Sequence, residues 1–143
     1  MSRKVEMLPL APGTSFPTVK RAESVWKSFG YAFDGIVYAF RTQRNFKIHT
    51  GTTVLVVIAG LVLNVSESEW AALAIVVGLV FQTELTNTAV EAIVDRISPD
   101  YHELAKVAKD CSAAAVLVSA IAAAVVGLVV FGHHVLAMLG IGG

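Results

Sequence analysis

A polar stripe within an apolar helix constrains this chain more than any other feature. The stretch 70–97 reads as a membrane-spanning helix, and four polar side chains interrupt it at spacings of 3, 4 and 4: Glu84, Asn87, Glu91 and Asp95. At about 100° per residue these side chains fall within roughly 80° of one another. An acid at the centre of a membrane helix costs about 2.5–3.5 kcal/mol, whereas each Leu, Ile, Val or Phe returns about 0.3–0.6 kcal/mol. The stripe must therefore face a protein partner, a water-filled cleft or the membrane boundary, where an acid is a candidate functional residue.

The composition places the chain in a membrane. Of its 143 residues, 55% are hydrophobic and 15% are charged, against about 25% charged in an average soluble domain. The formal net charge is zero, so no nucleic-acid partner is expected, because such a partner needs a basic surface. The single cysteine, Cys111, excludes an internal disulfide and a Cys-rich zinc site. These features predict an all-α integral membrane protein with one compact unit.

The chain divides into a short tail and one membrane domain. Residues 1–16 contain no continuous apolar run, which predicts a disordered tail and no signal peptide. Residues 17–143 are expected to form the domain, which begins with an amphipathic helix at 17–40. Its mixture of aromatic and basic side chains suits the headgroup layer of a membrane. Three predicted transmembrane helices follow, at 46–65, 70–97 and 111–131.

The positions of the basic residues predict an orientation. Of the eleven Lys and Arg residues, eight lie before or at the start of the first span, and three lie at the end of the second span or in the loop that follows it. The link at 66–69 and the segment after 131 contain none. The positive-inside rule therefore places the N-terminus and the second loop in the cytoplasm and the C-terminus outside. The expected location is the bacterial cytoplasmic (inner) membrane, with the polar stripe in its cytoplasmic half.

Further polar residues are expected at the same depth as the stripe. Gln43 precedes the first span, and Lys109 and Asp110 precede the third. Carboxylates beside a lysine suit Mg²⁺ and a polyphosphate, and Glu84, one turn deeper and away from water, suits a general base. The chain lacks a Walker-type glycine loop. The residues alone leave open phosphoryl transfer at the membrane, an ion or proton pathway, and a structural contact between helices.

Several segments resemble the prokaryotic membrane lipid kinases, the diacylglycerol kinases and undecaprenol kinases. Residues 84–96 read ELTNTAVEAIVDR and residues 101–111 read YHELAKVAKDC, which is similar to the family pattern E-x-x-N-[ST]-A-[IV]-E-A-[IV]-V-D, then Y-H-x-L and A-K-D. Residues 30–32 (GYA) match the G-Y-[AS] of the family's surface helix. Residues 45–49 (NFKIH) are similar to the N-F-[RK]-I-H of the undecaprenol kinase branch. The resemblance covers about 26–131.

The resemblance implies a homotrimer with composite active sites between subunits. It implies ATP and Mg²⁺ as co-substrate and metal, and a lipid alcohol and membrane lipids as further partners. Glu84 would be the general base and Glu91 a Mg²⁺ ligand. Gln43 stands where family members have a metal-binding glutamate, and it offers an amide oxygen without a charge. Six residues would contact the nucleotide and its phosphates: Lys27, Tyr31, Asn87, Asp95, Lys109 and Asp110.

The main alternative is a small ion channel or a proton-coupled transporter subunit that uses the same acidic stripe. That function predicts charges through the full membrane depth, whereas the outer halves of the predicted spans carry none. A structural trimer without catalysis is a third possibility, and it predicts that Glu84→Gln is harmless. Within the kinase interpretation, the choice between undecaprenol and diacylglycerol stays open.

We expect different roles and positions for the four histidines. His49 is expected to bind a headgroup or a loop through a hydrogen bond rather than to take part in catalysis. His102 is expected to cap a helix at the interface. His133 and His134 are expected to lie on the opposite side of the membrane from the polar stripe.

Overall fold

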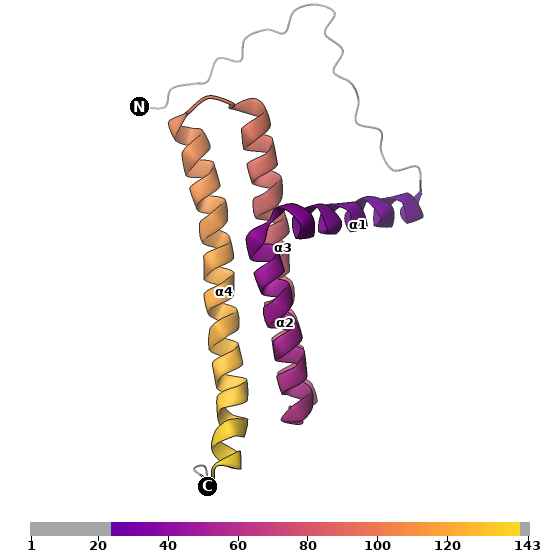
Figure 1. The fold of residues 1–143 in the computed structure, drawn as a ribbon, viewed down its shortest axis with the longest axis vertical. Coiled ribbons are helices and arrows are strands. Elements are labelled where there is room, and N and C mark those ends of the chain that lie inside the picture. The colour runs from indigo at the N-terminus through magenta and orange to yellow at the C-terminus, as the bar shows by residue number, and fades with distance from the viewer. Residues whose placement is uncertain (1–23, 141–143) are drawn as a thin grey trace, which may run out of the picture.

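The computed structural model describes residues 24–140, which form four α-helices and no strand (Figure 1). The helices are α1 (Val25–Thr42), α2 (Arg44–Val62), α3 (Glu67–Ile97) and α4 (Glu103–Met138). The all-α prediction is confirmed. The predicted disordered tail, 1–16, and the first residues of the predicted surface helix, 17–23, lie outside the described residues.

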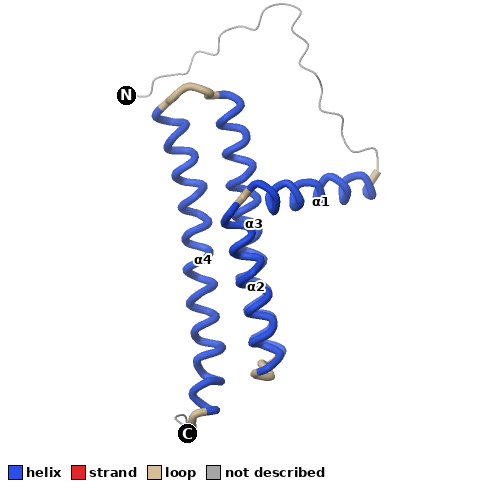
Figure 2. The backbone as a smooth tube through the Cα atoms, viewed as in Figure 1, coloured by secondary structure: helices blue, strands red, loops and turns tan. Residues whose placement is uncertain are grey.

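Three of the helices, α2, α3 and α4, are long and apolar enough to cross a membrane, which confirms the predicted number of spans. Helix α3 packs against both α2 and α4, and α1 lies crosswise to these three helices (Figure 2). We call the end of the bundle that carries α1 the α1 end; it includes the start of α2 and the α3–α4 loop. The α2–α3 link and the end of α4 lie at the opposite, far end (Figure 1).

A single residue separates the surface helix from the first span. Gln43 has an extended backbone (φ −96°, ψ 121°), so the chain turns sharply between α1 and α2. The first turn of α1 is capped by Ser24, whose hydroxyl accepts the backbone N–H of Lys27 at 3.3 Å. The helix continues to Thr42, two residues beyond the predicted end at 40.

The link between α2 and α3 lies three residues earlier than predicted, at 63–66 rather than 66–69. Helix α2 ends at Val62 rather than at 65, and Asn64 adopts the left-handed conformation with φ 51°. Helix α3 begins at Glu67 rather than at 70, because Ser66 and Glu69 form a capping box. In it the Ser66 hydroxyl accepts the Glu69 N–H at 3.4 Å, and the Glu69 carboxylate accepts the Ser66 N–H at 2.7 Å.

The last helix is much longer than the predicted span 111–131. It has 36 residues and begins at Glu103, so most of the segment predicted as a polar loop is helical. The charges in its first turns are compatible with a helix, since a helix satisfies its own backbone groups with or without apolar side chains. The ring Nδ1 of His102 accepts the Leu104 N–H at 3.2 Å, which confirms the predicted capping role of His102.

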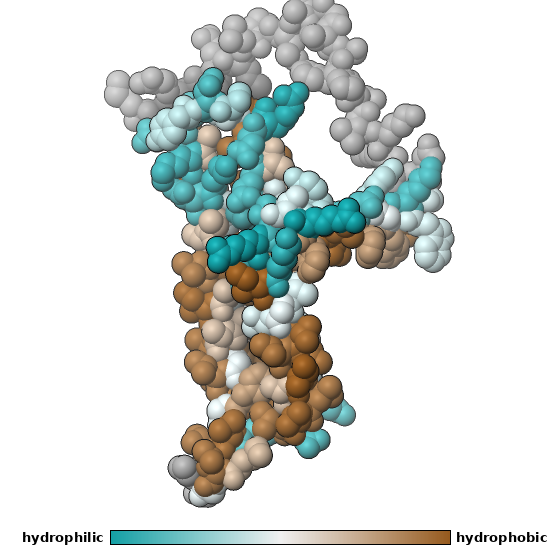
Figure 3. All heavy atoms as spheres, in the orientation of Figure 1, coloured by the Kyte–Doolittle hydropathy of each residue, from teal (hydrophilic) through white to brown (hydrophobic). Residues whose placement is uncertain are grey.

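The buried core is small, and most large apolar side chains face outward. One core cluster, at the far end, contains Val65, Leu73 and Val130. By contrast, Leu55 and Leu128 are 67% and 74% exposed. Figure 3 shows hydrophobic atoms over the far half of the helices and hydrophilic atoms around α1 and the α3–α4 loop. Such an extensive outward apolar surface suits lipid rather than water.

Candidate active site

The polar stripe of α3 turns from the bundle interior toward the surface at the α1 end. Glu84 and Asn87 are buried, at 1% and 8% exposed. Glu91 is half-buried and Asp95 is exposed. Burial thus decreases along the stripe from Glu84 to Asp95, so the two ends of the stripe have different chemical environments.

Glu91 is the centre of a hydrogen-bond cluster that joins two parts of the chain. Its Oε1 accepts from Asn87 Nδ2 at 3.1 Å, and its Oε2 accepts from Gln43 Nε2 at 3.2 Å. Asn87 lies one turn earlier on α3, whereas Gln43 comes from the α1–α2 junction. The structure therefore brings together the two residues that the sequence predicts as metal ligands, Gln43 and Glu91.

The donor set around Glu91 fits a metal that arrives with a phosphate. Within residues 24–140, no group of three or more His, Cys, Asp and Glu side chains is placed to hold a metal ion. Glu91 supplies one carboxylate, and Gln43 would supply an amide oxygen if its amide group turned over. Mg²⁺ commonly binds through one or two carboxylates, with water and substrate phosphates as its remaining ligands.

Helix α4 closes the cluster with a residue whose role the sequence analysis did not identify. The Ser112 hydroxyl donates to Asn87 Oδ1 at 2.7 Å, so Asn87 is held from two sides. The available signal was spacing, since Ser112 follows Lys109 by three residues and shares its face of the helix. A pocket of about 340 Å³ opens beside these groups, between α2, α3 and α4, and is lined in part by Asn45, His49, Asn87, Glu91 and Val116.

The exposed end of the stripe lies beside the start of α4. Lys109 Nζ donates to Asp95 Oδ1 at 2.9 Å, and Lys106 pairs with Asp110 one turn away. These side chains are exposed, and exposed ion pairs contribute little stability, so they can exchange partners with a ligand. A second pocket, of about 480 Å³, lies here at the α3–α4 loop, and its lining includes Asp95, Tyr101, His102, Lys109 and Asp110.

Glu84 lies deepest and is the least satisfied residue of the stripe. Its Oε1 is buried without a hydrogen bond, and the nearest charged or chargeable group is the ring of His49, with Nε2 at 3.4 Å. The Thr88 hydroxyl bonds to the backbone carbonyl of Glu84 at 2.9 Å and not to its carboxylate. The side chain of Glu84 is therefore left available for a ligand.

Two predicted nucleotide-binding residues lie away from this cluster. Lys27 and Tyr31 are in the first half of α1, which extends outward from the three long helices (Figure 1). Tyr31 is 61% exposed. A single subunit therefore does not bring these two residues to the Glu91 cluster.

Comparison with known proteins identifies the family of this chain. The family model for prokaryotic diacylglycerol kinase matches residues 30–131. The chain is 50% identical to a diacylglycerol kinase of Synechocystis over 81% of its own length and 69% of that relative. It is 42% identical to the undecaprenol kinase of Bacillus subtilis, over 74% of this chain and 86% of the relative. Its identity with the diacylglycerol kinase of Escherichia coli is 34%, over 76% and 88% of the two chains.

The matched residues include the whole of α2 and α3, the α3–α4 loop and most of α4. They therefore include every residue of the Glu91 cluster and the buried Glu84. Three apolar helices, an acidic stripe and these relatives agree on one assignment. The chain belongs to the prokaryotic diacylglycerol kinase family and is a membrane lipid kinase.

Proposed function

We propose that this protein transfers the γ-phosphate of ATP, with Mg²⁺, to the hydroxyl group of undecaprenol or diacylglycerol, and that Glu84 is the general base. The observation that carries the proposal is the state of Glu84, which is buried and has a carboxylate oxygen without a hydrogen bond. A carboxylate kept in that state costs free energy unless a ligand uses it. The hydroxyl of a lipid alcohol is a donor that suits it.

Phosphoryl transfer needs positioning and charge neutralisation more than covalent help from the protein. Glu84 accepts the hydroxyl proton as the lipid oxygen approaches the γ-phosphate. Asn87 lies one turn from Glu84, and its amide is held by Glu91 and Ser112, so it can orient a phosphate oxygen. When bound, Mg²⁺ would neutralise phosphate charge, with Glu91 and Gln43 as its protein ligands.

The nucleotide is assigned to the exposed end of the stripe. Lys109 would exchange its pairing with Asp95 for a phosphate, and Asp110 would order the start of α4. Lys27 and Tyr31 would complete a nucleotide site in a homotrimer, where the outward half of α1 reaches a neighbouring subunit. Composite sites of this kind account for the separation of α1 from the cluster in a single chain.

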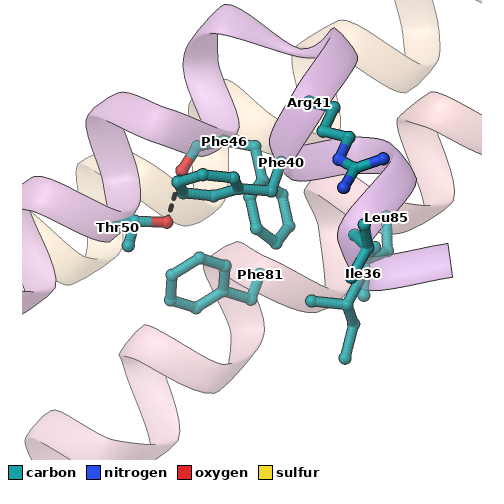
Figure 4. Close-up of a pocket in the computed structure, with 8 residues that line it drawn as sticks. Ile36, Phe40, Arg41, Phe46, Thr50, Phe81 and Leu85 are labelled. Atoms are coloured by element: carbon teal, nitrogen blue, oxygen red, sulfur yellow. Dashed lines mark hydrogen bonds between the residues drawn. The ribbon is translucent and has the colours of Figure 1, made fainter. Parts of the chain in front are cut away.

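The acceptor lipid is assigned to an apolar pocket at the elbow between α1 and α2 (Figure 4). Its volume is about 690 Å³, and Phe46 and Phe81 approach across it with ring centroids 5.0 Å apart. Two residues of its wall lie on α3 close to Glu84: Phe81 is three residues before it, and Leu85 directly follows it. A lipid chain in this pocket would hold its hydroxyl near the base, with Arg41 at the rim to receive the phosphorylated product.

The proposed location is the bacterial inner membrane, with the α1 end in the cytoplasm and the far end outside. Hydrophilic atoms gather at the α1 end (Figure 3), where the basic residues of the described chain also lie. ATP is available on this side only. The ion channel or transporter alternative is not favoured, because the relatives are named as kinases.

The test is transfer of labelled γ-phosphate from Mg·ATP to undecaprenol and to diacylglycerol in mixed micelles. The parent protein should label at least one lipid, and the faster acceptor identifies the substrate. Glu84→Gln should lower the rate by about 10²- to 10⁴-fold, the usual contribution of a general base. If folded parent protein labels neither lipid, the proposed acceptors are wrong.

A further inference from the structure

Glu84 Oε1 is unusual among the polar atoms of this structure. Within residues 24–140, it is the one buried side-chain nitrogen or oxygen that makes no hydrogen bond. The nearest partner comes from another helix: His49 Nε2 of α2 lies 3.4 Å away. This distance exceeds that of a good hydrogen bond.

His49 occupies a junction between two cavities. Its side chain is 22% exposed, and it lines the polar pocket that contains Asn87 and Glu91. The same ring also lines an apolar groove of about 760 Å³ between α2, α3 and α4, which continues toward the far end past Val56. An imidazole at this point is therefore next to the reacting end of the site and not in a loop or at a helix terminus.

We propose that His49 is a positioning residue for Glu84, which rests on the proposed role of Glu84 as general base. A carboxylate only accepts hydrogen bonds, so the ring must carry its proton on Nε2 to bind Oε1. This bond fixes the rotation of the Glu84 carboxylate and leaves its other oxygen directed to the lipid hydroxyl. It also replaces water as the partner of a buried charge.

The role of His49 in the reaction is to hold Glu84 and not to react. As the lipid oxygen forms its bond to the γ-phosphorus, the bond from phosphorus to the bridging oxygen of ADP breaks. The hydroxyl proton moves to Glu84, and the electron pair of the broken bond stays on ADP. His49 keeps its proton throughout. Hydrogen bonds of this type are often long without substrate and tighten when it binds.

Three variants test the proposal in the full-length protein. His49→Leu removes the donor at similar volume and should lower kcat by about 10- to 100-fold, the range expected for a hydrogen bond to a charged group. His49→Gln keeps an N–H at the reach of Nε2 and should restore kcat to within about 3-fold of the parent. Thr52→Val, on the wall of the same apolar groove, is the matched control and should leave kcat unchanged. The KM values for Mg·ATP and lipid should change little in all three, since His49 affects the chemical step only through Glu84.

A double substitution of His49 and Glu84 distinguishes a positioning role for His49 from a structural one. In a Glu84→Gln background, His49→Leu should cause no further loss, because a residue that acts through Glu84 has nothing left to position. An independent readout is the ¹⁵N resonance of the His49 ring, assigned with His49→Gln, which should shift when Glu84 becomes Gln.

Each outcome bears on the inference. The inference is overturned if His49→Leu keeps the parent kcat or if His49→Gln is as slow as His49→Leu. It is also overturned if the ¹⁵N resonance of the His49 ring does not shift in Glu84→Gln. The failure of the proposed base looks different, since Glu84→Gln would then keep full turnover. An inactive Glu84→Gln beside a fully active His49→Leu would reject the positioning role alone.

Discussion

Two glutamates of helix α3, Glu69 at the far end and Glu84 near the middle of the helix, are in opposite states. At the far end, the Glu69 carboxylate accepts from the Ser66 N–H and hydroxyl, both at 2.7 Å, and lies 3.1 Å from His134 Nε2. Toward the α1 end, Glu84 is buried and leaves Oε1 without a hydrogen bond. The same residue type on one helix is thus fully satisfied in one place and unsatisfied in the other.

The difference separates a structural charge from one held ready for chemistry. Glu69 starts α3 and joins it to α4, a task that needs its oxygens occupied. A buried carboxylate that did only structural work would be replaced at lower cost by an amide. Glu84 keeps a carboxylate, and its Oε1 makes no hydrogen bond although His49 lies close to it; a base needs such an available oxygen before substrate binds.

Paired substitutions of the two glutamates should produce the largest difference. Glu84→Gln should lower lipid phosphorylation by about 10²- to 10⁴-fold, while its unfolding midpoint stays at or above that of the parent, because the buried group becomes neutral. Glu69→Gln should keep the parent turnover. Rates in mixed micelles and thermal unfolding of the same preparations give both quantities.

Equal rates for the two variants would contradict the proposed difference between the two glutamates. If both are active, neither glutamate is the base. If both are inactive and also unfold early, Glu84 is a structural residue like Glu69.

The sequence predicted the parts of this comparison that depend on spacing along one helix. The 3-4-4 pattern correctly placed Glu84, Asn87, Glu91 and Asp95 on one face. The order of the spans correctly placed His133 and His134 at the opposite end from the stripe. The sequence predicted the link at 66–69 only as polar, although Ser66 and Glu69 carry a capping-box pattern. The sequence predicts a loop at the start of α4 because this segment is charged, whereas the helix begins at Glu103 and extends beyond the apolar layer.

Contacts between helices could not be predicted in the same way. The approach of His49 to Glu84, and of Ser112 to Asn87, depends on the rotation and height of α2 and α4 against α3. Periodicity within one segment indicates which residues share a face of a helix. It does not indicate which residues of another helix pack against that face. The nucleotide role of Lys27 and Tyr31 depends further on other subunits and stays a prediction.

A glycine substitution should show that the far end serves stability. A Cβ on Gly60 would lie 2.5 Å from the Trp70 ring, so Gly60→Ala must displace the indole that packs there. Overpacking of this kind costs about 1–3 kcal/mol. The unfolding midpoint should fall, while turnover per folded molecule stays the same.

Gly78→Ala is the matched control, since nothing lies within 4 Å of the added methyl group. It should be neutral or stabilising, because alanine favours a helix over glycine by about 1 kcal/mol. If Gly60→Ala unfolds no earlier than Gly78→Ala, the indole does not fix α2 against α3.

At the α1 end, a change at Gln43 should alter the metal requirement. Gln43→Glu places a second carboxylate beside Glu91 and should lower the Mg²⁺ concentration for half-maximal activity by about 10-fold, equivalent to about 1.4 kcal/mol. Without Mg²⁺ the two acids repel one another, so the variant should also unfold earlier in chelator than in Mg²⁺.

Gln43→Met, of similar length but without an amide oxygen, is the opposite control and should raise the Mg²⁺ requirement. Activity measured against free Mg²⁺ at saturating ATP distinguishes the three proteins. Identical Mg²⁺ curves would remove Gln43 from the metal site.

The smallest effect is expected from Ser66→Ala at the far end. Loss of an N-cap hydroxyl typically costs about 0.5–2 kcal/mol, and here it removes the bonds from the hydroxyl to the Glu69 N–H and carboxylate. The Ser66 backbone N–H still donates to Glu69, which limits the loss. Stability should therefore fall slightly, and both kcat and the Mg²⁺ requirement should match the parent. A change in either kinetic quantity would mean that the two ends of α3 are coupled, because the capping box lies about four helical turns from Glu84.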